Sequence, residues 1–208
     1  MHSFGLGLMV AGAVIGCSGE SPASPTQGTP VIVAFGDSLT SGPGLSPEQT
    51  YPALLQARIT EEGLNYRVIN AGVSGDTSSD ALRRFDSALV PDAGILIIAI
   101  GANDGLRRVA ITTVERNIAT MIERAQSRGI QVLLCQMEAP PFGGLNYTIE
   151  FHRAFTRLTE RYEVPLVPFF LLGLFGNDEL NLDDNLHPNA AGHKIIAETI
   201  WPHLRAML

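Results

Sequence analysis

The stretch VIVAFGDSLT (Val31–Thr40) is a run of apolar residues that leads directly into a glycine, an aspartate and a serine. An apolar run of this length is typical of a strand that is buried on both faces of a parallel sheet. The serine follows the strand at the place where a helix is expected to begin. A hydroxyl there lies at the carboxyl edge of a sheet and in the positive field of a helix N-terminus. The stretch therefore predicts an α/β fold with Ser38 in a functional position.

The rest of the chain alternates between apolar runs and helical patterns, which predicts a parallel sheet with right-handed crossovers. We expect a three-layer, flavodoxin-like α/β fold in which a five-stranded parallel sheet, order 2-1-3-4-5, lies between helices. The expected strands are residues 31–35, 66–70, 95–100, 130–135 and 166–169. The expected helices are residues 52–62, 79–89, 113–128, 149–162 and 188–208.

Polar loops follow the first three expected strands, at residues 36–38, 70–76 and 101–105. In the order 2-1-3-4-5 these loops are neighbours around the first strand, at the edge where open parallel sheets form their sites. Near the other end of the chain, Asp184 and His187 lie three residues apart. A serine, an aspartate and a histidine in this order suggest a serine hydrolase.

The composition is that of a globular protein with a sizeable core, because 45% of the 208 residues are hydrophobic and 17% are charged. The net charge is −7 and there is no run of Lys or Arg, which argues against a nucleic-acid partner. No Cys/His cluster has zinc spacing and no glycine-rich loop matches a phosphate cradle, so we expect no metal and no cofactor. Cys135 lies in an expected strand, which favours a buried core residue.

The N-terminal segment predicts export. Residues 4–16 are apolar or small and uncharged, too short to span a bilayer, which needs about 20 residues, but typical of a secretory signal. Residues 14–17 resemble a bacterial lipobox, which implies a lipid-modified Cys17 as the first mature residue. The usual Lys or Arg near the start is missing, and a plain secretory signal is the alternative.

We therefore expect three segments: a lipoprotein-type signal peptide at residues 1–16, a flexible tether at 17–30 and the folded domain at 31–208. The tether is rich in Ser, Pro, Gly and Thr, a composition that does not pack a core. The expected location is the cell envelope, with a lipid anchor in the outer membrane or on the periplasmic face. Otherwise the protein is secreted or periplasmic.

Four sequence blocks resemble those of the SGNH (GDSL) hydrolase superfamily. Within it, the chain is most similar to the group of bacterial arylesterases, acyl-CoA thioesterase I and lysophospholipase L1. The resemblance covers residues 31–208 in the expected order and spacing. The blocks are Gly36–Leu39, the glycine Gly72, Gly101–Asp104 and Asp184–Pro188.

The resemblance implies an ester hydrolase that works through an acyl-enzyme on Ser38. His187 would act as the base and Asp184 would orient it. The oxyanion hole would consist of the backbone N–H groups of Ser38 and Gly72 and the side-chain amide of Asn103. Expected substrates are small-molecule esters with short to medium acyl or aryl groups, with thioesters and lysophospholipids as further candidates.

Two segments are expected to flank the acyl pocket. One is the loop from Val73 to Asp80. The other is residues 140–147, where Phe142, Leu145 and Tyr147 offer apolar surface.

Several residues also have structural interpretations. Ser38 and Asn103 are residue types that commonly cap helices, and we expect Asp37 and Asp104 to have such turn or cap roles. Asp183 is an alternative partner for His187, although the three-residue spacing favours Asp184.

His152, His193 and His203 lie on expected helices and are interpreted as solvated surface residues. A carbohydrate O-acetylesterase is an alternative function. A non-catalytic, flavodoxin-like binding lipoprotein is another, but it would leave the Asp184/His187 pair unexplained.

Overall fold

The computed structural model describes residues 1–2, 28–169, 171–174 and 176–208. Residues 3–16 of the expected signal, the lipidation site Cys17 and most of the expected tether lie outside the described residues. One parallel sheet has the order β2-β1-β3-β4-β5, which confirms the predicted topology. Its strands are β1 (Val31–Gly36), β2 (Arg67–Gly72), β3 (Ala93–Ala99), β4 (Gln131–Cys135) and β5 (Leu166–Val167).

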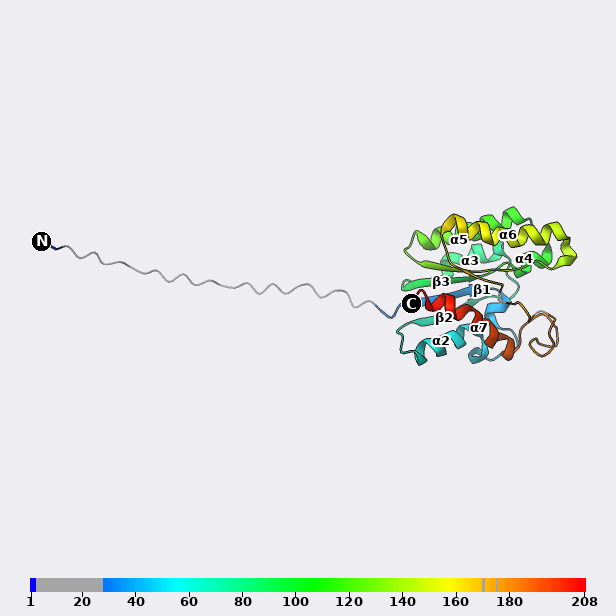
Figure 1. The fold of residues 1–208 in the computed structure, drawn as a ribbon, viewed down its shortest axis with the longest axis horizontal. Helices are drawn as coiled ribbons and strands as arrows, with labels where there is room; N and C mark the ends of the chain where they lie inside the picture. The colour runs from blue at the N-terminus through cyan, green and yellow to red at the C-terminus, as the bar shows by residue number, and fades with distance from the viewer. Residues whose placement is uncertain (3–27, 170, 175) are drawn as a thin grey trace.

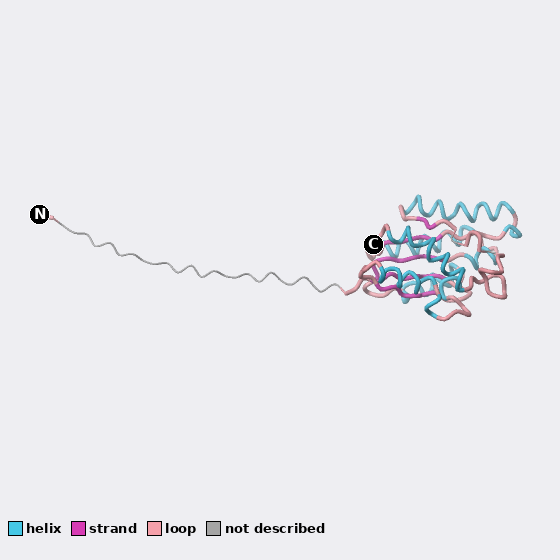
Figure 2. Tube along the Cα trace, turned by 60° about the horizontal axis from the view of Figure 1, so that its bottom comes forward, coloured by secondary structure: helices cyan, strands magenta, loops and turns pink. Residues whose placement is uncertain are grey.

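Helices cover both faces of the sheet, so the predicted three layers are present (Figure 1, Figure 2). Figure 1 shows α3, α4, α5 and α6 on one face, with α2 and α7 on the other. The helices are α1 (Ser38–Ser41), α2 (Tyr51–Glu61), α3 (Ser78–Ala88), α4 (Ala102–Arg107), α5 (Ile111–Gln126), α6 (Leu145–Tyr162) and α7 (Ala190–Arg205), with 3-10 turns η1 (Pro47–Gln49) and η2 (Pro141–Gly143). The short α1 and α4 are absent from the expected set, because each is less than two turns long and lies in a stretch that reads as a polar loop.

The core forms where the apolar pattern predicts it. Every residue of β1 is buried, and β3 is buried from Ile95 onward, as expected for strands covered on both faces. One stripe of α5, from Val114 to Ala125 at helical spacing, is buried against the sheet. Cys135 is fully buried and reduced, which confirms its interpretation as a core residue.

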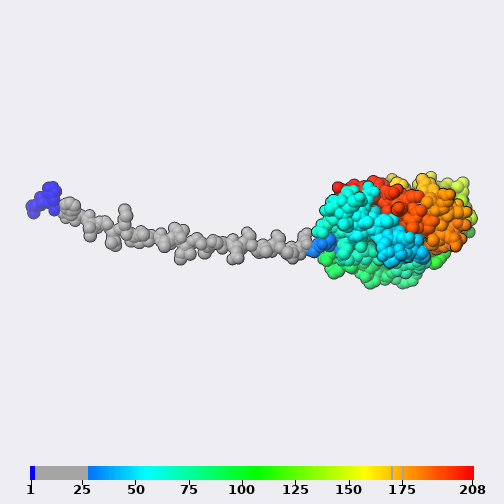
Figure 3. Space-filling model, turned by 90° about the horizontal axis from the view of Figure 1, so that it is seen from below, coloured from blue at the N-terminus to red at the C-terminus, as the bar shows by residue number. Residues whose placement is uncertain are grey.

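α7 packs beside α2, and Figure 3 shows the two helices (red and cyan) on the same face of the molecule. A buried histidine joins them: the backbone N–H of Tyr51 donates to His193 Nδ1 at 3.0 Å, and the two rings stack. His193 is only 1% exposed, so its expected place on the solvated surface is wrong. Burial lowers the pKa of His193 to about 4, because the interior disfavours the charged imidazolium.

Candidate active site

Ser38 is the first residue of α1, two residues beyond Gly36 at the carboxyl end of β1. Asp37 caps this helix, because its Oδ1 accepts a hydrogen bond from the Leu39 N–H at 3.0 Å. Asp37 is fully buried. Burial raises its pKa to about 7, although the Leu39 hydrogen bond opposes the shift. The cap role predicted for Asp37 is therefore confirmed, and it fixes where α1 begins.

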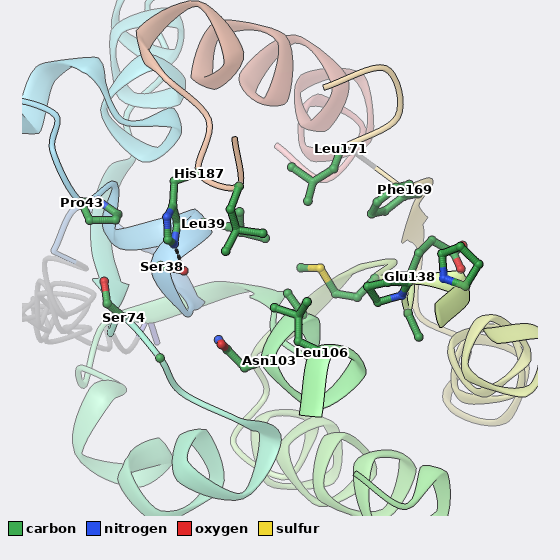
Figure 4. A pocket seen from close by; sticks show the side chains of 17 residues that line it. Ser38, Leu39, Pro43, Ser74, Asn103, Leu106, Glu138, Phe169, Leu171 and His187 are labelled. Carbon is green, nitrogen blue, oxygen red and sulfur yellow. Dashed lines mark hydrogen bonds between the residues drawn. The ribbon is translucent and has the colours of Figure 1, made fainter. Parts of the chain in front are cut away.

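The side chains of Ser38, His187 and Asp184 form a continuous hydrogen-bonded chain. Figure 4 shows the Ser38–His187 pair. His187 Nε2 lies 3.0 Å from Ser38 Oγ. On the other side of the imidazole, His187 Nδ1 lies 2.6 Å from Asp184 Oδ2. Residues 149 positions apart in the chain are thus placed for proton transfer from a hydroxyl to an imidazole.

Asp184 also holds the loop that carries His187. Its Oδ1 accepts from the backbone N–H groups of Leu186 and His187, both at 2.9 Å. Hydrogen bonds from His187, first from its side chain and then from its backbone, lower the pKa of Asp184 to about 2. The structure therefore pairs His187 with Asp184 rather than with Asp183.

Asn103 lies in the first turn of α4, at the carboxyl end of β3. Its Nδ2 donates to the backbone oxygen of Asp76 at 3.0 Å and has a longer contact, 3.4 Å, with Asp37 Oδ2. The amide is thus directed toward the loops that follow β1 and β2. In Figure 4 it lies across a short gap from Ser38.

Asp104 does not cap its own helix. It is fully buried, and its carboxylate accepts from the backbone N–H and the hydroxyl of Ser78, both at 2.7 Å. It therefore joins α4 to the first turn of α3. Gly101 precedes α4 instead, with a φ of 125° that favours glycine.

The structure does not place Gly72 at the site. Its N–H donates to Asn70 Oδ1 at 3.0 Å, so this donor is occupied. A Cβ on Gly72 would lie 2.3 Å from the Ser41 backbone nitrogen, so the glycine is required where β2 packs against α1. The resemblance implied an oxyanion-hole donor at Gly72, whereas the structure shows a close approach between two backbone segments there.

Gly75, three residues further on, lies at the site. It lines the same cavity as Ser38 and Asn103, and its φ of 84° favours glycine. Within the described part of the chain, the backbone N–H groups of Ser38 and Gly75 have no hydrogen-bond acceptor. Ser38, Gly75 and Asn103 therefore border one cavity, and the first two carry the backbone N–H groups just described.

A cavity of about 530 Å³ opens from Ser38 and His187 between the ends of the strands. Most of its wall is apolar, and Figure 4 shows Leu106, Phe169 and Leu171 around it. Glu138 lies beside Phe169, on the far side of the cavity from Ser38. An apolar cavity with polar groups gathered at one end is typical of a site for an acyl or aryl group.

The residues expected to bind substrate lie elsewhere. Val73, Phe142 and Leu145 are 44%, 71% and 70% exposed and do not line the cavity. The hydroxyl of Tyr147 donates to the Val109 backbone oxygen at 2.8 Å, so this ring supports the end of α4. The two expected segments do reach the cavity, but through other residues: Ser74, Gly75, Pro140 and Pro141.

Leu106, Met137, Phe169 and Leu171 also line the cavity and were not anticipated. The signal available in the sequence was their position just beyond β3, β4 and β5. Among the described residues, no group of His, Cys, Asp or Glu is arranged to hold a metal ion. No helix in the described ranges is long and apolar enough to cross a membrane.

Comparisons with known proteins agree on one family. The model of the GDSL-like lipase/acylhydrolase family matches residues 34–195. The esterase TesA of Pseudomonas aeruginosa is 36% identical over 178 residues, which is 85% of this chain and 89% of that protein. A crystal structure of TesA superposes with a TM-score of 0.81 at 36% identity, and covers 86% of this chain and 99% of that chain.

Two other relatives carry related names. An arylesterase of Vibrio mimicus is 34% identical over 86% of this chain and 90% of its own length. The thioesterase 1/protease 1/lysophospholipase L1 of Escherichia coli K12 is 28% identical over 85% of this chain and 84% of its own length. Together with the family model, these matches show that the chain belongs to the GDSL-like lipase/acylhydrolase family.

Proposed function

We propose that this serine ester hydrolase acts through an acyl-enzyme formed on Ser38 and takes short to medium acyl or aryl esters. One observation carries the assignment of the nucleophile: His187 Nε2 is 3.0 Å from Ser38 Oγ while Nδ1 is 2.6 Å from Asp184 Oδ2. This geometry lets the imidazole take a proton at one nitrogen and share its positive charge with a carboxylate at the other.

The reaction proceeds in two halves. Ser38 Oγ attacks the ester carbonyl carbon as its proton passes to His187 Nε2. The tetrahedral intermediate then collapses, the bond to the alcohol oxygen breaks, and His187 donates the proton to this leaving group. In the second half a water molecule loses a proton to His187 and attacks the acyl carbon. The bond between the acyl carbon and Ser38 Oγ then breaks, His187 returns its proton to Ser38 Oγ, and the acid is released.

The oxyanion is proposed to accept hydrogen bonds from the backbone N–H groups of Ser38 and Gly75 and from Asn103 Nδ2. Gly75 replaces Gly72 in this role, because the N–H of Gly72 is bonded to Asn70. Each such donor is typically worth about 3–4 kcal/mol of transition-state stabilisation.

The character of the cavity supports the substrate class. Its wall is mainly apolar, which favours an alkyl chain or an aromatic ring over a sugar, whose hydroxyls need many hydrogen-bond partners. The names of the relatives, esterase, arylesterase and thioesterase 1/lysophospholipase L1, agree with this class. We therefore include thioesters and lysophospholipids among the proposed substrates and rank a carbohydrate O-acetylesterase below them.

A panel of substrates tests this ranking. We expect p-nitrophenyl esters to be hydrolysed with kcat/KM rising from acetate to medium chains, as each buried CH₂ adds apolar contact worth about 0.8 kcal/mol. Acetylated xylo-oligosaccharides serve as the competing class. Efficient deacetylation of the sugars together with negligible turnover of butanoate and longer esters would reverse the ranking.

We also propose that residues 1–16 direct export, that Cys17 carries a lipid anchor and that residues 17–30 tether the domain that starts at Val31. The support is the uncharged apolar stretch followed by the lipobox-like residues Val14–Cys17. In a bacterial host, the full chain is expected in the membrane fraction and its Cys17→Ser form in the soluble fraction. Membrane association that is equal in both forms, or absent from both, would contradict the anchor.

A further inference from the structure

A single guanidinium group, that of Arg84 in α3, connects three segments behind the site. Its Nη2 donates to the backbone oxygen of Gly36 at 2.8 Å, and its Nη1 donates to that of Ala71 at 2.9 Å. Its Nε donates to the carboxylate of Asp76 at 2.6 Å. The group also lies over the ring of Phe35, 4.3 Å from its centroid. The guanidinium of Arg84 thus makes three hydrogen bonds and one cation–π contact, and the side chain is only 22% exposed.

Each contact of Arg84 leads to a different part of the catalytic geometry. Gly36 ends β1 and precedes Ser38 by two residues. Ala71 is the next-to-last residue of β2, two residues before Val73, where the loop that contains Gly75 begins.

Asp76 is the far end of this loop. Its backbone oxygen accepts the hydrogen bond from Asn103 Nδ2 at 3.0 Å, and its N–H closes a turn on Val73 at 3.3 Å. Gly75 thus lies between two points, Ala71 and Asp76, that Arg84 holds.

We propose that Arg84 is a positioning residue for the oxyanion hole: it fixes the loop that carries Gly75, and through Asp76 the amide of Asn103, relative to Ser38. This inference rests on the proposed roles of Ser38, Gly75 and Asn103. Arg84 itself touches neither the cavity nor the reacting atoms; it acts through the backbone that it binds.

The chemistry explains why an arginine stands here. A planar guanidinium can donate in three directions at once in a fixed geometry, whereas the ammonium of a lysine is a flexible point charge. The three acceptors, two backbone oxygens and the carboxylate of Asp76, lie where the N–H groups of one guanidinium reach them together. A displacement of about 1 Å at a catalytic group can cost on the order of 100-fold in rate. Loss of the three hydrogen bonds of Arg84 is therefore expected to lower kcat strongly.

The neighbouring Arg83 provides a matched control. It lies on the same helix, but its side chain is 73% exposed and pairs with Asp80 at the surface. Arg83→Met therefore removes the same charge one residue away without disturbing the backbone behind the site, and we expect it to retain wild-type kcat and KM.

We expect Arg84→Met to lower kcat for p-nitrophenyl butanoate by about 10- to 100-fold, with KM within about twofold of the wild type. Arg84→Lys should recover part of the loss, because it keeps the charge near Asp76 but not all three hydrogen bonds. Asp76→Ala should lower kcat in the same manner. It removes the partner of Arg84 Nε and so tests the same interaction if Arg84→Met does not fold.

A second measurement separates positioning from a general loss of stability. An alkyl trifluoromethyl ketone adds Ser38 Oγ to its carbonyl carbon, the serine proton passes to His187, and the resulting oxyanion occupies the oxyanion hole. Its inhibition constant should rise in proportion to the loss of kcat in the Arg84 and Asp76 variants. The inhibition constant of a 1-alkanol of the same chain length, which fills the cavity without forming an oxyanion, should stay unchanged.

The proposal is overturned if Arg84→Met and Asp76→Ala, both folded, lose no more kcat than Arg83→Met. It is also overturned if the loss lies in KM, or if ketone affinity does not change. A different result would show that the proposed ester hydrolysis through Ser38 is itself wrong. In that case the wild-type protein would hydrolyse no ester, or the wild type and Ser38→Ala would hydrolyse esters at the same rate.

Discussion

Replacing Ser38 with alanine is expected to lower kcat for ester hydrolysis by about five to six orders of magnitude and to leave the fold intact. The hydroxyl oxygen is the only heavy atom lost, and within the described residues its side-chain hydrogen bond is to His187 Nε2. The cap of α1 is provided by Asp37, so the helix does not depend on the hydroxyl. The loss therefore reports chemistry rather than folding.

The measurement is steady-state hydrolysis of p-nitrophenyl butanoate by the wild type and Ser38→Ala, with thermal unfolding of both proteins. Ser127→Ala is the matched control, because it removes a hydroxyl whose hydrogen bond, among the residues that the structure describes, is to the Arg124 backbone oxygen near the exposed end of α5. Ester turnover by Ser38→Ala within tenfold of the wild type would exclude Ser38 as the nucleophile.

The second large effect is expected at Asp184. Asp184→Asn should lower kcat by about 1,000- to 10,000-fold, because an amide at this place no longer stabilises the imidazolium or fixes the tautomer that presents an acceptor to Ser38. The pKa of Asp184 is about 2, so the carboxylate is charged throughout the neutral range. The side chain of Asp184 is 48% exposed, so solvent screens its charge. We therefore expect the loss of kcat not to exceed about 10,000-fold.

Asp183→Asn is the paired control for this experiment. The two carboxylates are adjacent in sequence, but His187 Nδ1 bonds to Asp184. We expect Asp183→Asn to retain wild-type kcat. If Asp183→Asn loses activity and Asp184→Asn retains it, the assignment of the acidic residue is reversed.

Much of the fold could be predicted from the sequence because its signals are local. The apolar runs at residues 31–35 and 95–100 are typical of strands covered on both faces, and the helical stretches between the strands favour parallel crossovers. The three-residue spacing of Asp184 and His187 also acts locally, through one turn. These features are present in the structure where they were expected.

The oxyanion loop shows where sequence reasoning fails. Gly72 and Gly75 both follow β2 within a few residues, and both are glycines that a turn or a close approach requires. Which N–H is free depends on the side chain of Asn70, which bonds to Gly72. It also depends on α1, which packs against Gly72. These are contacts between segments far apart in the chain, and residue spacing does not encode them.

The cavity and the buried histidine were missed for the same reason. Leu106 lies on α4, and Phe169 and Leu171 follow β5. These residues are far apart in the chain and come together because both segments line the same cavity. The sequence pattern of α7 does not decide whether His193 faces the core or the solvent. In the structure His193 is buried against α2, where it accepts a hydrogen bond from the Tyr51 N–H. Polar residues buried with one specific partner look like surface residues in a sequence.

The most direct test of a Ser38 acyl-enzyme is covalent trapping with an alkyl p-nitrophenyl phosphonate, followed by intact-mass measurement and peptide mapping. Attack by Ser38 Oγ displaces p-nitrophenolate and leaves a stable phosphonyl group on the serine. The account predicts release of one equivalent of p-nitrophenolate, a single adduct on the peptide that contains Ser38, and no adduct on Ser38→Ala. An adduct on another residue, or an unmodified Ser38 in an enzyme that the phosphonate has inactivated, would contradict it.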